Sequence, residues 1–344
     1  MYYDGTKLLS MKDINGETPE LYLCTSNRTA GKTTYFSRLL MNRFFDKGEK
    51  FALLYRFGYE LDDCANKFFK DISSLFFNDR VMIGTNKASG TFVELSIDGA
   101  VCGYAMALNL ADNIKKYSHL FSDVQRIMFD EFQSETSHYC TKEIEKFQSV
   151  HTSIARGQGK QVRYVPVYML SNTVSIINPY YVALGISNRL RNDTKFLRGD
   201  GFVLEQGYNE TASQSMMSSA FNRAFANSKS KYLQYATQNV YLNDNSAFVE
   251  RPQGKSTYIC TLRYNGSDYS VKEYRDAGIV YCDNKSDETF PLKITVTTED
   301  HQINYVMLKR NDGLISTLRF FFEKGAFRFK DLQCKEAILS ALSY

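Results

Sequence analysis

Short apolar runs alternate with segments of helical periodicity along residues 1–200. Compact apolar runs are typical of buried parallel strands, whereas apolar residues that recur every three or four positions indicate amphipathic helices. The runs are Leu21–Cys24, Lys50–Phe57, Arg126–Phe129 and Val162–Leu170, and the helical segments are Tyr35–Phe45, Glu60–Leu75 and Cys140–Ile154. This alternation predicts an α/β domain with a mainly parallel sheet.

An additional group of strands interrupts the alternation between the second and third apolar runs. Arg80–Gly84, Thr91–Ile97 and Val101–Leu108 have the apolar content of short strands, and Asp98-Gly99 is a tight-turn signal between the last two. We therefore expect a hairpin inserted at one edge of the sheet.

The pattern loosens after residue 200. Glu210–Ala226 is rich in alanine, serine and methionine and compatible with helix, so we expect residues 201–230 to form a partly helical linker. Strands then dominate, at Ser256–Tyr264, Tyr269–Arg275, Gly278–Cys282 and Leu292–Thr297. A helical stretch is expected next, followed by shorter runs at Leu318–Phe322 and Phe327–Phe329 and a final helix at Lys330–Leu342. The expected domains are 1–200 and 231–344.

Composition narrows the class of protein without naming a function. The 344 residues are 43% hydrophobic and 14% aromatic, which is ample for sizeable cores, and the net charge of +4 permits contact with nucleic acid without arguing for it. The seven cysteines are scattered singly, so a disulfide framework or a zinc site is not expected. We expect a soluble, intracellular protein, because no stretch has the length of a membrane span or the form of a signal peptide.

The stretch between the first predicted strand and the first predicted helix has the pattern of a phosphate-binding loop. It reads Ser26-Asn27-Arg28-Thr29-Ala30-Gly31-Lys32-Thr33. In such a loop the backbone N–H groups wrap the β-phosphate, while Lys32 reaches the β- and γ-phosphates and the Thr33 hydroxyl ligates Mg²⁺. Ser26 departs from the pattern, because a glycine normally stands there and allows a tight turn. The alternative to a nucleotide-binding loop is a Gly-Lys-Thr sequence that occurs by chance at the start of a helix.

Polar residues follow two later apolar runs. Asp130-Glu131 ends the third run, about a hundred residues after the loop, where nucleotide hydrolysis needs an Asp for the Mg²⁺ shell and a Glu for the attacking water. Asn172 ends the fourth run and could sense the γ-phosphate, although most asparagines after a strand simply open a turn. Strand ends of a parallel sheet share one edge, where open α/β sheets place ligands.

These motifs together resemble the encapsidation ATPases of phi-twenty-nine-like phages, which are related to large terminase subunits. The resemblance is carried by the loop, by Met41-Asn42-Arg43-Phe44, Gly48-Glu49 and Arg56, by Met128–Phe132, and above all by Leu170-Ser171-Asn172-Thr173-Val174-Ser175-Ile176-Ile177-Asn178-Pro179-Tyr180. It is strong over residues 20–190, with fainter matches at Ile294–Glu299 and Leu318–Phe329. It implies a RecA-like (ASCE) P-loop ATPase domain.

The resemblance also implies roles for individual residues. Arg28 matches a loop arginine thought to touch the nucleotide phosphates, Asp130 and Glu131 match the magnesium and catalytic acids, and Asn172 matches the polar residue of the coupling motif. Arg156 falls closest to the arginine that a neighbouring subunit supplies, with Arg163 as its competitor and Lys115 or Lys116 as a further basic candidate. Such a guanidinium would stabilise charge on the transferring phosphoryl group.

The implied function is ATP-driven packaging of double-stranded DNA into a procapsid. The family implies a ring of subunits, five by resemblance, that acts in the host cytoplasm at the portal vertex, with or without a packaging RNA, and is absent from the mature virion and from membranes. The implied C-terminal domain is ribonuclease-H-like, and we expect it to bind DNA or procapsid without catalysis, because Ser256–Tyr264 contains no acid. Two alternatives stay open, namely an active metal-dependent nuclease in that domain and a binding module with a vestigial loop.

Overall fold

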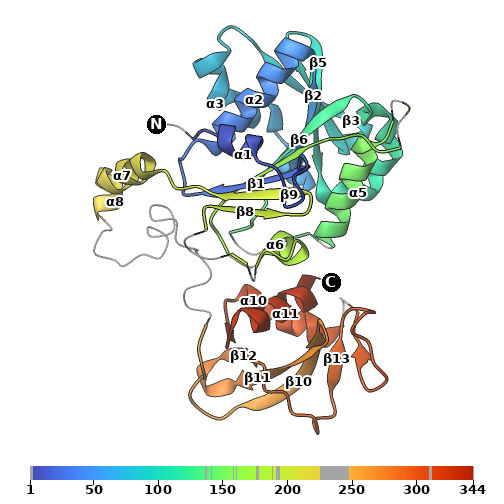
Figure 1. Cartoon of the computed structure of the whole chain (residues 1–344), viewed down its shortest axis with the longest axis vertical. Coiled ribbons are helices and arrows are strands. Elements are labelled where there is room, and N and C mark those ends of the chain that lie inside the picture. The colour runs from blue at the N-terminus through green and yellow to red at the C-terminus, as the bar shows by residue number, and fades with distance from the viewer. Residues whose placement is uncertain are drawn as a thin grey trace. The chain divides into compact units, whose positions relative to one another are not determined.

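The computed structural model describes residues 3–135, 138–140, 142–157, 159, 161–175, 178–187, 189–190, 194–224, 248–309 and 312–343. Contacts divide the chain into two compact units (Figure 1). The first comprises Met1–Gln133, Glu143–Thr173 and Asn192–Val240, and the second comprises Ser134–Lys142, Val174–Arg191 and Tyr241–Tyr344. The chain therefore leaves the first unit and returns to it twice before the second unit is complete.

The described part of the first unit contains a nine-stranded sheet with the order β3-β4-β5-β2-β6-β7-β1-β9-β8. The six strands from β5 to β9 in that order are mutually parallel, and β3, β4 and β8 add antiparallel edges. The strands are β1 (Leu21–Ser26), β2 (Lys50–Tyr55), β3 (Met82–Lys87), β4 (Phe92–Ile97), β5 (Ala100–Ala107), β6 (Val124–Asp130), β7 (Val167–Asn172), β8 (Phe196–Gly199) and β9 (Phe202–Gln206). The prediction of a mainly parallel α/β sheet is confirmed.

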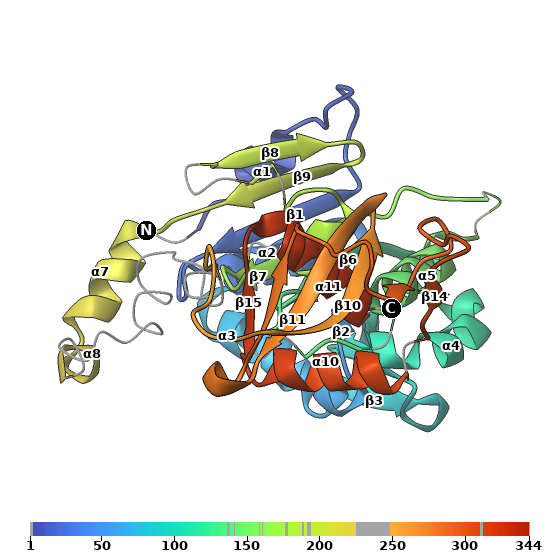
Figure 2. The same cartoon turned by 90° about the horizontal axis from the view of Figure 1, so that it is seen from below.

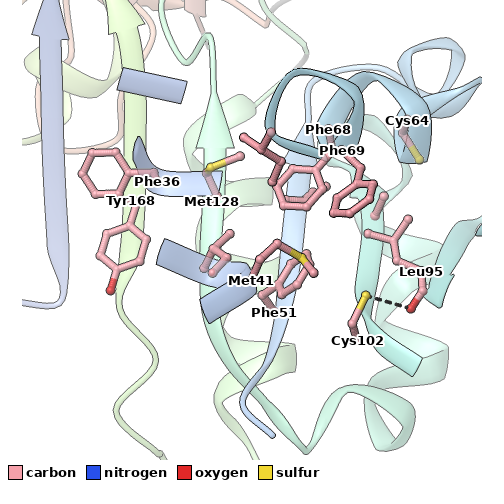
Figure 3. Packing of buried hydrophobic residues seen from close by; sticks show 14 of the residues in the cluster. Phe36, Met41, Phe51, Cys64, Phe68, Phe69, Leu95, Cys102, Met128 and Tyr168 are labelled. Atoms are coloured by element: carbon pink, nitrogen blue, oxygen red, sulfur yellow. Dashed lines mark hydrogen bonds between the residues drawn. The ribbon is translucent and has the colours of Figure 1, made fainter. Parts of the chain in front are cut away.

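Helices cover both faces of this sheet (Figure 1). On one face, α2 (Lys32–Lys47) and α3 (Cys64–Phe76) bury their apolar stripes, so that Phe36, Met41 and Phe68 meet Phe51, Met128 and Tyr168 of the strands (Figure 3). On the other face, α5 (Glu143–Ala155) stacks Phe147 on Phe129 of β6, with ring centroids 6.2 Å apart. The remaining α-helices among the described residues of this unit are α1 (Thr6–Ser10), α4 (Ala111–Ile114), α7 (Glu210–Ser218) and α8 (Ala220–Ala224).

Several predicted elements shift or are replaced. The inserted hairpin is present at the sheet edge, with Asp98 and Gly99 both at positive φ in its turn. The strand expected at Val162–Leu170 begins only at Val167, directly after Pro166, which lacks the N–H that a central strand needs. The stretch at 202–206 was expected in the linker, but it is β9, which pairs in parallel with β1, so the first sheet extends past residue 200.

The described residues of the second unit contain a six-stranded sheet with the order β14-β13-β10-β11-β12-β15. Figure 2 labels β10, β11, β14 and β15 of this sheet. Its strands are β10 (Thr257–Tyr264), β11 (Ser267–Tyr274), β12 (Ile279–Asp283), β13 (Lys293–Thr295), β14 (Val306–Met307) and β15 (Phe327–Phe329). The first three form the predicted antiparallel meander, and β13, β14 and β15 pair in parallel with β10, β13 and β12.

Helices α10 (Gly313–Glu323) and α11 (Leu332–Ser343) share one core with this sheet, and α6 (Pro179–Ala183) belongs to the same unit. Leu318–Phe322, expected as a short strand, lies within α10, where Ile315 and Leu318 are buried one turn apart. No helix of the described residues is long and apolar enough to cross a membrane. All seven cysteines are buried free thiols.

Candidate nucleotide-binding site

The predicted phosphate loop connects β1 to α2 in the first unit. Gly31 has φ 94° and ψ 17° immediately before the helix, a left-handed conformation that favours glycine. Thr29 also has a positive φ, of 60°. Ser26, by contrast, is the last residue of β1 and pairs with Asn172 of β7, so its backbone is part of the sheet. Serine at this position therefore requires no glycine-like conformation.

Lys32 is held inside the loop and is only 6% exposed. Its ammonium group donates hydrogen bonds to Ser26 Oγ at 2.9 Å, to Asn172 Oδ1 at 3.4 Å and to the Asn27 carbonyl at 3.5 Å. Burial lowers the pKa of Lys32, and the positive charge of the half-buried Arg28 lowers it further. An anionic ligand at this point would offset both effects.

Thr33 and Asp130 bring two oxygen atoms together beside the loop. Thr33 Oγ1 donates a hydrogen bond to Asp130 Oδ2 at 2.8 Å. Burial raises the pKa of Asp130, against the opposing effects of the Thr33 hydrogen bond and the Lys32 charge. A hydroxyl and a carboxylate are the hard oxygen ligands that Mg²⁺ takes from nucleotide-binding proteins, with phosphates and water supplying the rest. These residues fit a magnesium site.

Glu131 follows β6 directly, with an exposed side chain and a φ of 56°. Its N–H donates to Asp130 Oδ1 at 3.0 Å, and its carbonyl accepts from both terminal nitrogens of Arg56 at 3.3 Å. The structure therefore brings Asp130, Glu131, Asn172 and the loop to the carboxyl edge of neighbouring strands, as predicted.

Two residues that the sequence analysis gave no role also hold this site. Arg56, at the end of β2, binds the backbone after β6. Asn209 pairs reciprocally with Asn27: its N–H donates to Asn27 Oδ1 at 2.9 Å, and Asn27 Nδ2 donates to its carbonyl at 3.1 Å. Asn209 also caps α7 by accepting from the Ala212 N–H. Arg56 was among the residues that carry the family resemblance, and asparagine commonly precedes a helix, but neither signal indicates the contacts that these residues make here.

The basic candidates for a role in a neighbouring site lie elsewhere. Arg163 is 7% exposed and donates to the carbonyls of Val124 and Ile154 at 3.1 and 2.7 Å, so it ties the end of α5 to the start of β6. Arg156 is exposed just after α5, with Nε 3.3 Å from the Thr152 carbonyl. Lys115 and Lys116 are exposed beside Asp112 and Asn113. The amino end of β6 is the sheet edge opposite the loop, so this unit does not bring Arg156 to its own Lys32.

Comparison with known proteins identifies the family. The model of the Podovirus DNA encapsidation protein (Gp16) matches residues 1–342. The chain belongs to this family. The DNA packaging proteins of Bacillus phages phi29 and PZA are each 24% identical to it over 333 residues, which cover 96% of this chain and 93% of those proteins. The predicted resemblance to phi-twenty-nine-like encapsidation proteins is confirmed.

Two solved structures share the fold of this encapsidation family member over nearly its whole length. The viral genome packaging motor assembly of bacteriophage Phi-29 has a TM-score of 0.57 and 22% identity, covering 96% of this chain and 95% of that one. The Phi-28 gp11 DNA packaging motor has a TM-score of 0.61 and 17% identity, covering 99% and 96%. At these identities the likeness extends to the fold, and the chemistry has to be argued from the site itself.

Proposed function

We propose that this encapsidation protein is the ATP-hydrolysing motor subunit that moves double-stranded DNA into a procapsid. The observation that carries the proposal is the convergence of Lys32, Thr33, Asp130 and Asn172 through direct hydrogen bonds at one sheet edge. A chance Gly-Lys-Thr at a helix start would not have its lysine buried against the end of one strand and its threonine against the acid of another.

Each residue of this edge has a role in hydrolysis. The loop amides from Asn27 to Gly31 hold the β-phosphate, and Lys32 exchanges its present acceptors for phosphate oxygens. Glu131 orients the attacking water and takes its proton, and Asn172 contacts the γ-phosphate or that water. Arg28 adds positive charge beside the phosphates. Thr33 and Asp130 would hold Mg²⁺, Asp130 through water; the ion neutralises charge on the phosphate oxygens when bound.

A trans-acting arginine completes the proposed site. Arg156 is exposed and lies at the sheet edge opposite its own loop, which supports its assignment to the site of a neighbouring subunit. The buried Arg163 is occupied by two carbonyls of its own unit, which makes it the weaker candidate. The proposed assembly is a homo-oligomeric ring, of five subunits by family likeness, at the portal vertex of the procapsid in the host cytoplasm. It contacts the portal directly or through a packaging RNA.

The second unit is proposed to be a ribonuclease-H-like domain that binds DNA or procapsid without cutting. Its antiparallel meander extended by parallel strands supports that fold. Three of its acids are engaged in structural bonds: Asp283 accepts from Ser270 and Lys272, Asp268 from Arg263 and Tyr305, and Asp300 from the backbone of the turn at Asn265. Metal-dependent cleavage of plasmid DNA by the full chain would instead support the terminase-like nuclease.

The decisive test replaces Lys32. Lys32→Ala should abolish ATP hydrolysis and DNA packaging together, since removing one preorganised charged donor commonly costs about 100-fold or more in rate. Lys47→Ala is the matched control, because Lys47 is exposed in the last turn of the same helix. If Lys32→Ala hydrolysed ATP at the parental rate, the proposed function would be wrong.

A further inference from the structure

Arg56 is a buried cation beside Glu131 and Phe132, and the proposed mechanism gives it no role. It follows β2 directly and is 7% exposed. Its Nη2 donates to the Phe132 carbonyl at 2.7 Å, and both Nη atoms lie 3.3 Å from the Glu131 carbonyl. The guanidinium also lies 5.6 Å from the centre of the Phe129 ring. Arg56 therefore binds the backbone on both sides of the Glu131–Phe132 peptide bond through hydrogen bonds to the two carbonyls.

The backbone at Glu131 needs such support. A φ of 56° places a non-glycine residue in the left-handed region, which costs about 1 kcal/mol or more and persists only where surrounding contacts enforce it. The Asp130 carboxylate accepts from the Glu131 N–H, Arg56 binds the Glu131 carbonyl, and the Leu170 carbonyl accepts from the Phe132 N–H at 3.1 Å. This conformation sets the direction in which the Glu131 side chain leaves the backbone.

Glu143 in turn fixes Arg56. Arg56 Nε lies 2.9 and 3.1 Å from the two carboxylate oxygens of Glu143, which is 4% exposed. Glu143 is the first residue of α5, where the helix dipole favours a negative charge. A buried ion pair contributes little net stability but holds its partners in one geometry, because each charge left alone would be costly.

We infer that Arg56 is a positioning residue that aims Glu131 at the attacking water, with Glu143 holding the guanidinium in place. The inference rests on the proposed function, because Glu131 needs aiming only if it activates water. If Arg56 had a purely structural role, it would bind the same carbonyls, but its loss would lower the free energy of unfolding and leave kcat unchanged. A positioning role therefore predicts a change in kcat, whereas a structural role predicts a change in stability alone.

The test compares Arg56→Lys with Arg126→Lys in the full chain. Lysine keeps the charge but cannot make the planar fork of contacts. Arg126 is a suitable control because it is likewise an arginine paired with a glutamate, Glu49 at 2.8 Å, but it is part-buried and lies on β6 away from its carboxyl end. We expect Arg56→Lys to lower kcat by about 100-fold, the scale of a 1 Å misplacement, with ATP affinity unchanged. Arg126→Lys should keep the parental kcat.

A double substitution separates aiming from general damage. In a Glu131→Gln background, adding Arg56→Lys should lower the residual rate by no more than about twofold, because residues that act as a unit are non-additive. Glu143→Gln alone should lower kcat by about tenfold without affecting ATP affinity, and it serves if Arg56→Lys does not fold. The inference would be overturned if Arg56→Lys lowered the rate by the same factor in the Glu131→Gln background as in the parent. It would also be overturned if Arg56→Lys and Glu143→Gln both kept the parental kcat.

The same measurements distinguish this inference from the proposed function. If Glu131→Gln alone keeps the parental rate, the proposed function fails. If Glu131→Gln is inactive while Arg56→Lys hydrolyses ATP normally, only the role of Arg56 fails.

Discussion

The Thr33 hydroxyl donates a hydrogen bond to the Asp130 carboxylate across 2.8 Å, although 97 residues separate the two in the chain. The bond joins the start of α2 to the end of β6. It brings together two oxygen atoms that would hold a magnesium ion.

Removing the Thr33 hydroxyl should weaken the use of magnesium more than the binding of nucleotide. Thr33→Ala deletes one proposed ligand, so the Mg²⁺ concentration for half-maximal ATP hydrolysis should rise by about tenfold or more. Thr33→Ser retains the hydroxyl and is the matched control, which should stay within about threefold of the parent. A magnesium titration of the hydrolysis rate measures both. An unchanged titration curve for Thr33→Ala would count against the metal assignment.

Glycine at position 26 should be tolerated, even though serine is the departure from the loop pattern. Ser26→Gly removes the hydroxyl that accepts from Lys32, so the free energy of unfolding should fall by about 1–2 kcal/mol while hydrolysis stays within about threefold. Gly31→Ala is the contrasting variant, because Gly31 has a φ of 94° and alanine there would be strained. Urea unfolding and steady-state hydrolysis distinguish the two. A larger activity loss for Ser26→Gly than for Gly31→Ala would contradict this interpretation of the loop.

Replacing Arg163 should lower stability, whereas replacing Arg156 should lower ATP hydrolysis. Arg163→Ala leaves the Val124 and Ile154 carbonyls without this donor in a buried place, so it should lower stability by about 2–4 kcal/mol. Arg156→Ala removes an exposed side chain and should leave the unfolding midpoint unchanged, yet abolish hydrolysis by the assembled ring.

Mixing subunits tests whether Arg156 acts in trans. Arg156→Ala and Lys32→Ala are each expected to be inactive alone, but a mixed ring contains some interfaces with an intact loop on one side and an intact arginine on the other. Hydrolysis should therefore return in part when the two variants are combined before assembly. No recovery at any mixing ratio would point to action within one subunit or to no role for Arg156.

The stability of the first unit should depend on pH through His151. His151 Nε2 lies 3.0 Å from the Val165 carbonyl and 3.5 Å from Glu20 Oε1. Burial alone lowers the pKa of His151, but the hydrogen bond and charge of Glu20 outweigh it, so the pKa is raised above its usual 6.5. The stabilisation is complete below about pH 6.5 and is lost as the pH rises through the raised value.

The measurement is the Tm at a series of pH values from about 5.5 to 8.5. The parent should lose part of its Tm as the imidazole deprotonates, and His151→Gln should flatten this part of the profile, because glutamine has no titrating group. A Tm that rises over the same interval only when His151 is present would reverse the expected sign.

The candidate nucleotide-binding edge could be predicted because its residues stand at, or in the loop after, the ends of apolar runs. In a parallel sheet those ends meet at one edge, so Lys32, Asp130 and Asn172 could be placed near one another from order and spacing alone. The contacts of Arg56 and Asn209 could not be predicted in this way. Each depends on a pairing across the fold, Arg56 with Glu143 and Asn209 with Asn27, and neither pairing leaves a local pattern in the chain.

The secondary structure was harder to predict where the conformation favoured by the local sequence differs from the one that packing in the fold selects. Phe202–Gln206 is a short run after a loose segment, and it is a strand because the free edge of β1 is available to pair with it. Leu318–Phe322 is rich in aromatic residues that favour strands, yet it is helical because its apolar positions face one core at helical spacing. The expected domain limits and the ribonuclease-H-like identity of the second unit remain predictions.

Helix α5 links the two edges of the sheet that the proposed mechanism uses. Its first residue, Glu143, holds Arg56 beside the catalytic glutamate, and its last turn is tied by Arg163 to the far end of β6, next to Arg156. Thirteen residues make a rod of about 20 Å. If Arg156 serves a neighbouring subunit, as proposed, α5 would connect the Glu143 end, beside one proposed site, to the Arg156 end, which would serve the next.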